Sequence, residues 1–273
     1  RVHFRPQRVG PRVTATREQT RTMYPGGSST LGSPSNTLTL IGPIAEPMRL
    51  SIIIPVYNER ATIAEMLARV QAVELDTQVI IVDDASTDGT TAWLDEWARR
   101  QPDGVTVHRH GQNRGKGAAI RTGLETVTGD YVIIQDGDLE YDPSDYVRLL
   151  APLLDGRGRV VYGSRFLGGH HGMFFTQRAG NAALTKLTNL LFGAALTDME
   201  TCYKLFARDV IDGLNLASNR FNIEPELTAK VLKQGLEIIE VPISYVGRSY
   251  SSGKKINWRD FVSAVWTLLR LRL

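Results

Sequence analysis

The sequence contains a single cysteine, Cys202, among 273 residues. One cysteine cannot close an internal disulfide, so nothing points to an oxidising compartment. No apolar run reaches the roughly 18 residues that a membrane-spanning helix requires, since the longest candidate, 184–196, is short and interrupted by polar residues. With 25 glycines and 12 prolines the chain is neither collagenous nor mainly low-complexity. Its length allows one large domain or two modest ones.

Positive charge is unevenly distributed along the chain. The first 46 residues contain six arginines and two acidic residues, a net charge of +4, whereas the remainder has 26 basic and 27 acidic residues. Gly-, Ser- and Pro-rich stretches at 25–29 and 32–36, without an apolar period, predict a disordered basic tail over residues 1–46. We find no nucleic-acid recognition motif in this tail and expect no nucleic-acid partner.

Beyond residue 47 the pattern becomes that of an α/β protein. Short β-branched runs alternate with helical stretches of about a dozen residues. Strands are expected at 50–57, 79–82, 104–108, 131–134, 160–162 and 237–241, with an antiparallel strand at 202–206. Helices are expected at 63–70, 88–100, 116–127, 176–192, 224–234 and 257–273. This alternation predicts a mostly parallel sheet with helices on both faces.

Three of the expected strands end in polar clusters, at residues 57–59, 83–84 and 136–138. Ligands of such sheets bind at the carboxyl ends of the strands, near the point where the strand order reverses. Three polar strand ends in one sheet therefore predict a binding site at this edge.

The carboxylates of Asp136 and Asp138, with Glu140 after them, are the clearest chemical signal. Alternate carboxylates directly after a buried strand are costly to hold together unless a cation neutralises them. Such hard oxygen ligands suit Mg²⁺ or Mn²⁺, particularly where substrate phosphates complete the coordination shell. A solvated acidic turn is the alternative interpretation, but the other polar strand ends favour a metal site.

Two further stretches carry polar groups near expected strand ends. Residues 83–90 include enough acids and hydroxyls both to cap the next helix and to place a carboxylate against a nucleobase or ribose. Residues 113–117 are Gly-rich and basic before another helix but lack the Walker A spacing. Lys116 in that stretch is a candidate to approach a phosphate.

These stretches, in this order, resemble the family 2 glycosyltransferases with the GT-A fold. The likeness rests on residues 54–59, 82–90 and 136–138, the last being the family's D-x-D motif. Further stretches look like the branch of dolichol- and polyprenyl-phosphate mannose or glucose synthases: 113–117, 163–165, 198–204, 240–243 and the basic segment 248–255. The resemblance implies a GT-A domain over residues 47–256.

The resemblance implies a role for each matching residue. Donor-binding residues would be Pro55, Tyr57, Glu59, Asp84, Lys116 and Asp136. Metal ligands would be Asp136, Asp138 and Glu140, the last of which is often Gln in this branch. The acceptor phosphate would meet Arg165, Arg178, Arg248 and Lys254. The catalytic residues would be Asp138, Asp198, Arg165 and Arg178, and Cys202 stands where the branch usually has a glycine.

The implied reaction is an inverting, metal-dependent transfer of mannose or glucose from GDP-mannose or UDP-glucose to a polyprenyl phosphate. A phosphate acceptor is already ionised near neutral pH, so Asp198 would act in orientation or electrostatics more than in proton abstraction. Two alternatives stay open: a saccharide hydroxyl acceptor with Asp198 as a true base, and a non-catalytic protein that binds nucleotide sugars. A dinucleotide-dependent oxidoreductase is disfavoured because no G-x-G-x-x-G follows the first strand.

The C-terminal stretch 257–273 is an expected amphipathic helix with Trp258, Trp266 and an ending of alternating leucine and arginine. It can pack on the core or lie on a membrane surface, and we favour the membrane because a lipid-linked acceptor would be reached there. The basic segment 248–255 is interpreted either as a solvated loop or as a lid over phosphates. We expect a peripheral protein at the cytoplasmic membrane face, with a separate membrane-anchoring subunit as an open question.

Overall fold

The computed structural model describes residues 48–101, 104–168, 170–171, 173–247 and 258–273, with only the backbone described at 170–171. The predicted tail over 1–46 and the basic segment with Arg248 and Lys254 lie outside the described residues. The described residues fall within one structural unit, Ala45–Leu273.

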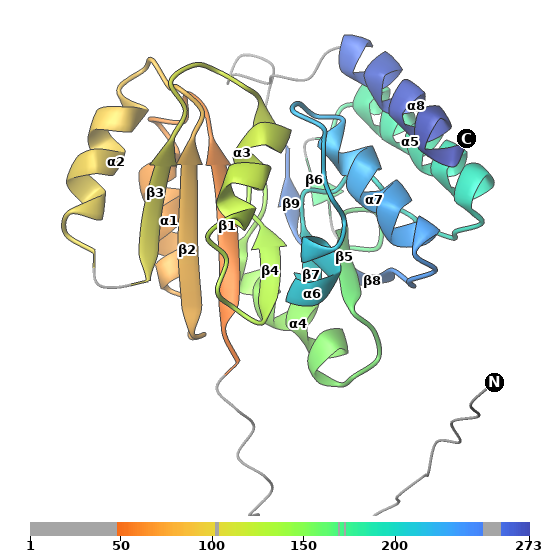
Figure 1. Ribbon diagram of the computed structural model, residues 1–273, viewed down its shortest axis with the longest axis horizontal. Helices are drawn as coiled ribbons and strands as arrows, with labels where there is room; N and C mark the ends of the chain where they lie inside the picture. Colours follow the sequence, from red (N-terminus) through yellow and green to blue (C-terminus); the bar gives the residue numbers. More distant parts are fainter. Residues whose placement is uncertain (1–47, 102–103, 169, 172, 248–257) are drawn as a thin grey trace, which may run out of the picture. The chain divides into compact units, whose positions relative to one another are not determined.

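A seven-stranded sheet lies at the centre, in the order β3-β2-β1-β4-β7-β5-β8 (Figure 1). Its strands are β1 (Leu50–Val56), β2 (Thr77–Asp83), β3 (Val105–Arg109), β4 (Tyr131–Ile134), β5 (Val160–Ser164), β7 (Lys204–Ala207) and β8 (Ile239–Pro242). All neighbours are parallel except β7, which runs antiparallel to both β4 and β5. A second sheet pairs β6 (His170–His171) with β9 (Tyr245–Val246). The predicted mostly parallel sheet and its antiparallel strand are confirmed.

The central strands are buried along almost their whole length, as their β-branched sequences predict. In β1 every residue except Pro55 is buried, and Ile52 to Ile54 are fully enclosed. Ile53 pairs with Ile80 of β2 on one side and with Ile134 of β4 on the other. This continuous apolar centre holds the carboxyl ends of β1, β2 and β4 at one edge of the sheet.

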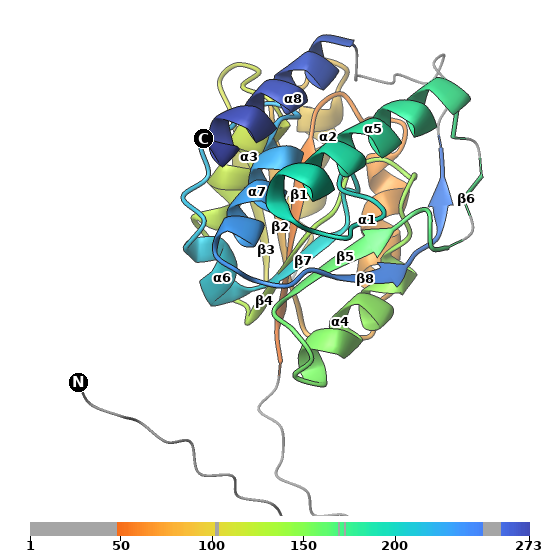
Figure 2. The ribbon, with the colours of Figure 1, turned by 90° about the vertical axis from the view of Figure 1, so that its right-hand side faces the viewer.

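Helices cover both faces of the sheet, with α3 and α7 on one side and α1 and α4 on the other (Figure 2). The helices are α1 (Ile63–Gln71), α2 (Thr90–Ala98), α3 (Lys116–Leu124), α4 (Tyr146–Leu154), α5 (Phe175–Phe192), α6 (Arg208–Asp212), α7 (Ile223–Lys233) and α8 (Trp258–Arg272), with a 3-10 turn at η1 (Pro143–Asp145). None of the described helices is long and apolar enough to cross a bilayer.

Helices α5, α7 and α8 enclose a second, smaller core. Its buried residues are Leu184, Leu196, Met199, Ala229, Ala264 and Leu268. Only one face of α8 contributes to it, since Val262 and Trp266 of the same helix stay exposed. The expected core packing of this helix is therefore seen on one face, and the expected membrane contact stays a prediction for the other.

The turn before α3 is fixed by the carboxylate of Asp84 at the end of β2. This carboxylate accepts hydrogen bonds from the backbone N–H groups of Arg114 (2.8 Å) and Gly115 (2.7 Å). Gly115 has φ of 98° and ψ of 164°, a region that only glycine adopts without strain. A Cβ at this position would also meet the carbonyl oxygen of Asn219 at 2.5 Å.

Replacing Gly115 by alanine is therefore expected to lower the free energy of unfolding by about 2 kcal/mol or more, because strain and a backbone clash add. Urea denaturation measures the loss. Gly111→Ala is the matched control, since a Cβ there meets nothing within 4 Å, and it should change stability by less than about 0.5 kcal/mol. Equal stability of the two variants would contradict this account of the turn.

Candidate active site

A pocket of about 580 Å³ opens at the carboxyl ends of β1, β2 and β4. The end of β1 contributes Pro55, Tyr57 and Glu59, and the end of β2 contributes Asp84. The stretch after β4 contributes Asp136, Asp138 and Glu140. The structure thus brings the three polar strand ends together in one pocket.

The other walls come from helices that are distant in sequence. Lys116 at the start of α3 lines the pocket, as do Gln177 and Asn181 of α5. Glu224 of α7 and Trp258 of α8, which come much later in the sequence, also line the pocket. Arg165, directly after β5, adds a guanidinium group to the wall.

The acidic stretch after β4 is held by hydrogen bonds and an ion pair. Asp136 Oδ1 lies 2.7 Å from Lys116 Nζ, and Asp138 Oδ1 accepts the N–H of Glu140 at 3.0 Å. Glu140 Oε2 accepts the hydroxyl of Tyr245 at 2.9 Å. Among the residues that the structure describes, no three His, Cys, Asp or Glu side chains are grouped to hold a metal by themselves. Two carboxylates in one pocket do fit a divalent ion whose remaining ligands come from phosphates and water.

Lys116 belongs to a buried chain of alternating charges. Its Nζ also lies 2.9 Å from Glu224 Oε1, and Glu224 Oε2 lies 2.5 Å from Nζ of Lys204. Lys204 is fully buried on β7 and also donates to the carbonyl oxygen of Thr201. Burial is the largest single influence on the pKa of Lys116 and lowers it, but the Asp136 and Glu224 carboxylates and the other neighbours together hold that pKa well above its usual value. Lys116 therefore remains a cation beside Asp136.

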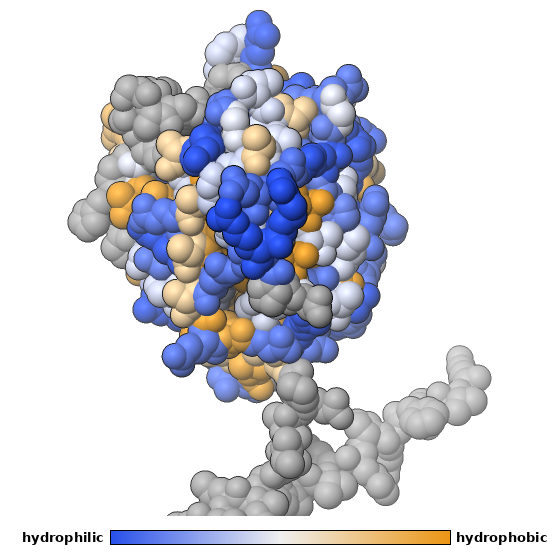
Figure 3. Space-filling view, turned by 90° about the vertical axis from the view of Figure 1, so that its left-hand side faces the viewer, coloured by the Kyte–Doolittle hydropathy of each residue, from blue (hydrophilic) through white to orange (hydrophobic). Residues whose placement is uncertain are grey.

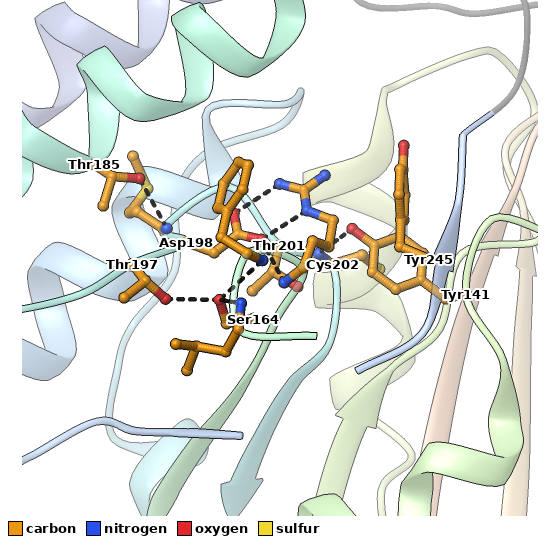
Figure 4. A network of polar contacts seen from close by, with 12 residues as sticks. Tyr141, Ser164, Thr185, Thr197, Asp198, Thr201, Cys202 and Tyr245 are labelled. Carbon is orange, nitrogen blue, oxygen red and sulfur yellow. Dashed lines mark hydrogen bonds and ion pairs between the residues drawn. The ribbon is translucent and has the colours of Figure 1, made fainter. Parts of the chain in front are cut away.

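Arg165 and Asp198 form a buried bidentate ion pair (Figure 4). Arg165 donates from Nε and Nη2 to the two carboxylate oxygens of Asp198, each at 2.7 Å, and its backbone N–H donates to Oδ2 at 3.0 Å. Burial is the largest single influence on the pKa of Arg165 and lowers it, but the charge and hydrogen bonds of Asp198 together with the neighbouring Tyr141 and Tyr245 raise that pKa. Asp198 is fully buried and does not line the pocket, whereas Arg165 does. Asp198 therefore orients the guanidinium group.

The residues predicted to meet an acceptor phosphate are placed differently from one another. Arg165 lies in the pocket wall. Arg178 is exposed on α5 and is not among the pocket-lining residues, which on that helix include Gln177 and Asn181. Side chains one position apart on a helix point about 100° apart, which explains the difference between Gln177 and Arg178.

Asp84, predicted to meet the base or ribose, lines the pocket but also organises the protein. Besides the two N–H groups of the turn before α3, its carboxylate contacts Nδ1 of His110 at 2.6 Å. His110 is buried and its Nε2 lies 3.0 Å from the hydroxyl of Thr122. These contacts hold His110 as a buried part of the packing around Asp84.

Comparison with known proteins identifies the family. The family model "Glycosyl transferase family 2" matches residues 51–214, more than half of the chain. The chain belongs to glycosyl transferase family 2. Polyprenol monophosphomannose synthase from Mycolicibacterium smegmatis is 30% identical over 232 residues, covering 80% of this chain and 86% of that protein. Undecaprenyl-phosphate mannosyltransferase from Micrococcus luteus is 31% identical over 215 residues, covering 76% and 87%.

A solved structure shows the same architecture. Glucosyl-3-phosphoglycerate synthase from Mycobacterium tuberculosis, in complex with Mn²⁺, uridine diphosphate and glucosyl-3-phosphoglycerate, superposes with a TM-score of 0.62 at 20% identity, covering 82% of this chain and 80% of that one. At this identity the similarity concerns the fold. The GT-A fold expected from the sequence is confirmed.

Several pocket residues of this family 2 glycosyltransferase have no individual signal in the sequence. Glu200 and Cys202 lie within the stretch 198–204, but the pattern does not say which of its side chains face the pocket. Glu224 and the α8 residues Trp258 and Phe261 belong to segments that the sequence predicts to be helices but does not place at the site. The packing of α7 and α8 brings them to the site.

Glu200 has a perturbed carboxyl group. Its Oε1 atom is buried without a hydrogen-bond partner among the described residues. Burial raises the pKa of Glu200 to about 7 from the usual 4.5, and the nearby Lys204 ammonium only partly offsets this. A carboxyl group whose pKa is raised by folding binds its proton more tightly in the folded protein than in the unfolded chain.

This proton makes stability depend on pH. The stabilisation from the protonated Glu200 is complete below about pH 4.5 and is lost as the pH rises through about 7. Glu200→Gln removes the ionisation. The free energy of unfolding of this variant minus that of the original chain should therefore rise by up to about 3 kcal/mol between about pH 5 and about pH 8. Urea denaturation of both proteins at both pH values measures this, and a difference independent of pH would refute it.

Proposed function

We propose that the chain is an inverting, metal-dependent hexosyltransferase that moves mannose or glucose from GDP-mannose or UDP-glucose to a polyprenyl phosphate. The observation that carries this proposal is that one pocket contains both the carboxylates of Asp136 and Asp138 and the buried guanidinium group of Arg165. The polyprenyl-phosphate mannosyl enzymes among the relatives support the acceptor class.

The donor would bind at the acidic side of the pocket. Asp136 and Asp138 would hold Mg²⁺ or Mn²⁺ together with the donor's pyrophosphate, and Glu140 is a further proposed ligand. The Mn²⁺ in the solved structure of similar fold supports this choice of metal. The ion would neutralise charge on the departing nucleoside diphosphate. Lys116, held as a cation by its neighbours, would add positive charge at the same side. Pro55, Tyr57 and Glu59 would border the nucleotide.

The acceptor phosphate would bind at Arg165. A guanidinium group matches phosphate oxygens in a planar, bidentate arrangement, and its ion pair with Asp198 fixes its direction in advance. An ionised phosphate attacks without losing a proton, so the proposed reaction needs no general base. Arg178, Arg248 and Lys254 stay predictions for this phosphate.

A saccharide hydroxyl as acceptor would require a base, for which Asp198 was the candidate. Both of its carboxylate oxygens accept hydrogen bonds from Arg165, and the residue is fully buried outside the pocket wall. This arrangement favours orientation over proton abstraction. It therefore supports the phosphate acceptor.

The proposed reaction is tested by incubating the purified full chain with labelled GDP-mannose or UDP-glucose and a polyprenyl phosphate in detergent. Label is expected in the lipid fraction and not in free oligosaccharides, and only when Mg²⁺ or Mn²⁺ is present. Asp138→Asn should lower kcat by roughly 100-fold or more, because charge on the leaving group is then poorly neutralised.

Asp155→Asn is the control for that variant, since Asp155 is exposed and, within the described part of the chain, forms an ion pair with Arg157 at 3.3 Å. It should leave turnover near normal, because exposed ion pairs contribute little. Transfer to oligosaccharides alone would refute the acceptor, and full turnover in EDTA would refute the metal.

We also propose that α8 contacts the membrane surface that carries the acceptor. Trp258, Val262 and Trp266 are spaced four residues apart, so they share one face of the helix, and all three are exposed. Arg259 and Arg270 lie beside this face, where they would meet anionic lipid headgroups. The opposite end of the sheet, over α2 and β3, is largely hydrophilic (Figure 3). The proposed location is the cytoplasmic membrane face, with or without an anchoring subunit.

Val262→Glu is expected to weaken binding of the full chain to vesicles of anionic and neutral phospholipid by about tenfold, because it places a charge in the apolar face. Co-sedimentation measures the binding. Val147→Glu on α4 is the matched control, since Val147 is 60% exposed and Val262 is 55% exposed. If both variants bind vesicles as well as the original chain does, α8 is not the contact.

A further inference from the structure

Glu200 lies beside two buried ion pairs whose charges already match. Arg165 pairs with Asp198 at 2.7 Å, and Lys204 pairs with Glu224 at 2.5 Å. All four groups act electrostatically on Glu200, two attracting and two repelling its charge. When ionised, Glu200 is therefore an additional negative group beside two pairs whose charges already balance.

One oxygen of Glu200 lacks a hydrogen-bond donor among the described residues. Oε1 is buried, yet the residue as a whole is partly exposed and lines the pocket. A buried carboxylate oxygen without a donor costs free energy, and native proteins rarely retain such a group without a functional reason. The part of the side chain that lines the pocket can accept a hydrogen bond from a ligand there, which would offset part of this cost.

The chemistry of the proposed substrates decides which part of them fits. Phosphate groups of the donor or the acceptor are anionic and would be repelled by the carboxylate. A prenyl chain supplies no donor and would leave the carboxyl group without one. Hexose hydroxyl groups are neutral donors, and a charged acceptor strengthens the hydrogen bonds that they make.

We propose that Glu200 accepts a hydrogen bond from a hydroxyl group of the transferred hexose and thereby helps to determine which sugar the pocket takes. This inference rests on the nucleotide-sugar donor of the proposed function, but not on the identity of the acceptor. Glu200 contacts the sugar alone, so it should affect binding of the nucleotide sugar and leave binding of the nucleoside diphosphate unchanged.

The test compares dissociation constants from calorimetry for the full chain and two variants. The probes are GDP-mannose with GDP and UDP-glucose with UDP, each in Mg²⁺ or Mn²⁺. Glu200→Gln should weaken binding of the preferred nucleotide sugar by roughly 10-fold or more. Its affinity for the matching nucleoside diphosphate should stay within about twofold of that of the original chain. Glu125→Gln is the matched control, because Glu125 is exposed at the end of α3 and does not line the pocket.

Nucleotide sugars with single hydroxyl groups removed give an independent readout that uses the unaltered chain. One such analogue should bind the original chain about tenfold more weakly than the parent sugar, and the difference should be smaller for Glu200→Gln, whose neutral amide oxygen is a weaker acceptor. Thermal melting confirms that each variant is folded. Glu200→Asp, which keeps the charge but shortens the side chain, should bind the parent sugar with reduced affinity and provides a second variant.

The outcomes separate this inference from the proposed function. Equal weakening of nucleotide sugar and nucleoside diphosphate by Glu200→Gln, or no weakening of either, overturns the role of Glu200. If the original chain binds nucleotide sugars no more tightly than the diphosphates and shows no analogue effect, the hexose contact is likewise overturned. A sugar-dependent loss in Glu200→Gln, together with no transfer to polyprenyl phosphate, supports the role of Glu200 and overturns the acceptor.

Discussion

Charged groups buried beneath the pocket must be paired, and this constraint governs the arrangement of the site. Arg165 pairs with Asp198, and Lys204 pairs with Glu224. Glu224 also pairs with Lys116, which in turn pairs with Asp136. Breaking a buried pair by removing one partner leaves an uncompensated charge, which is costly. The pairs therefore fix the direction of each cation before any substrate arrives.

The antiparallel strand β7 is what makes these pairings possible. Because β7 lies between β4 and β5, the segment that precedes it crosses the same edge of the sheet at which the parallel strands end. That segment carries Asp198 and Glu200 next to Arg165 at the end of β5. One reversal in a mostly parallel sheet thus joins the proposed donor side and acceptor side in one pocket.

Much of the fold and part of the site follow from local sequence. The β-branched runs at β1, β2 and β4 predict buried strands, and the polar residues after them predict the position of the pocket. The exposed position of Arg178 was not predicted, since a motif match assigns a residue type to a helix but not a direction. The second use of Asp84, as the anchor of the turn at Gly115, depends on contacts across 31 residues of sequence.

By itself, the sequence determined the alternation of strands and helices, the polar strand ends and the resemblance to the family, because each is encoded in short-range pattern and residue type. Only the tertiary structure decided which faces of α5, α7 and α8 line the pocket, that Asp198 stands behind Arg165, and that one oxygen of Glu200 has no donor among the described residues. The physical reason is that burial and pairing of charge depend on segments that pack together from distant parts of the chain, which no local pattern records.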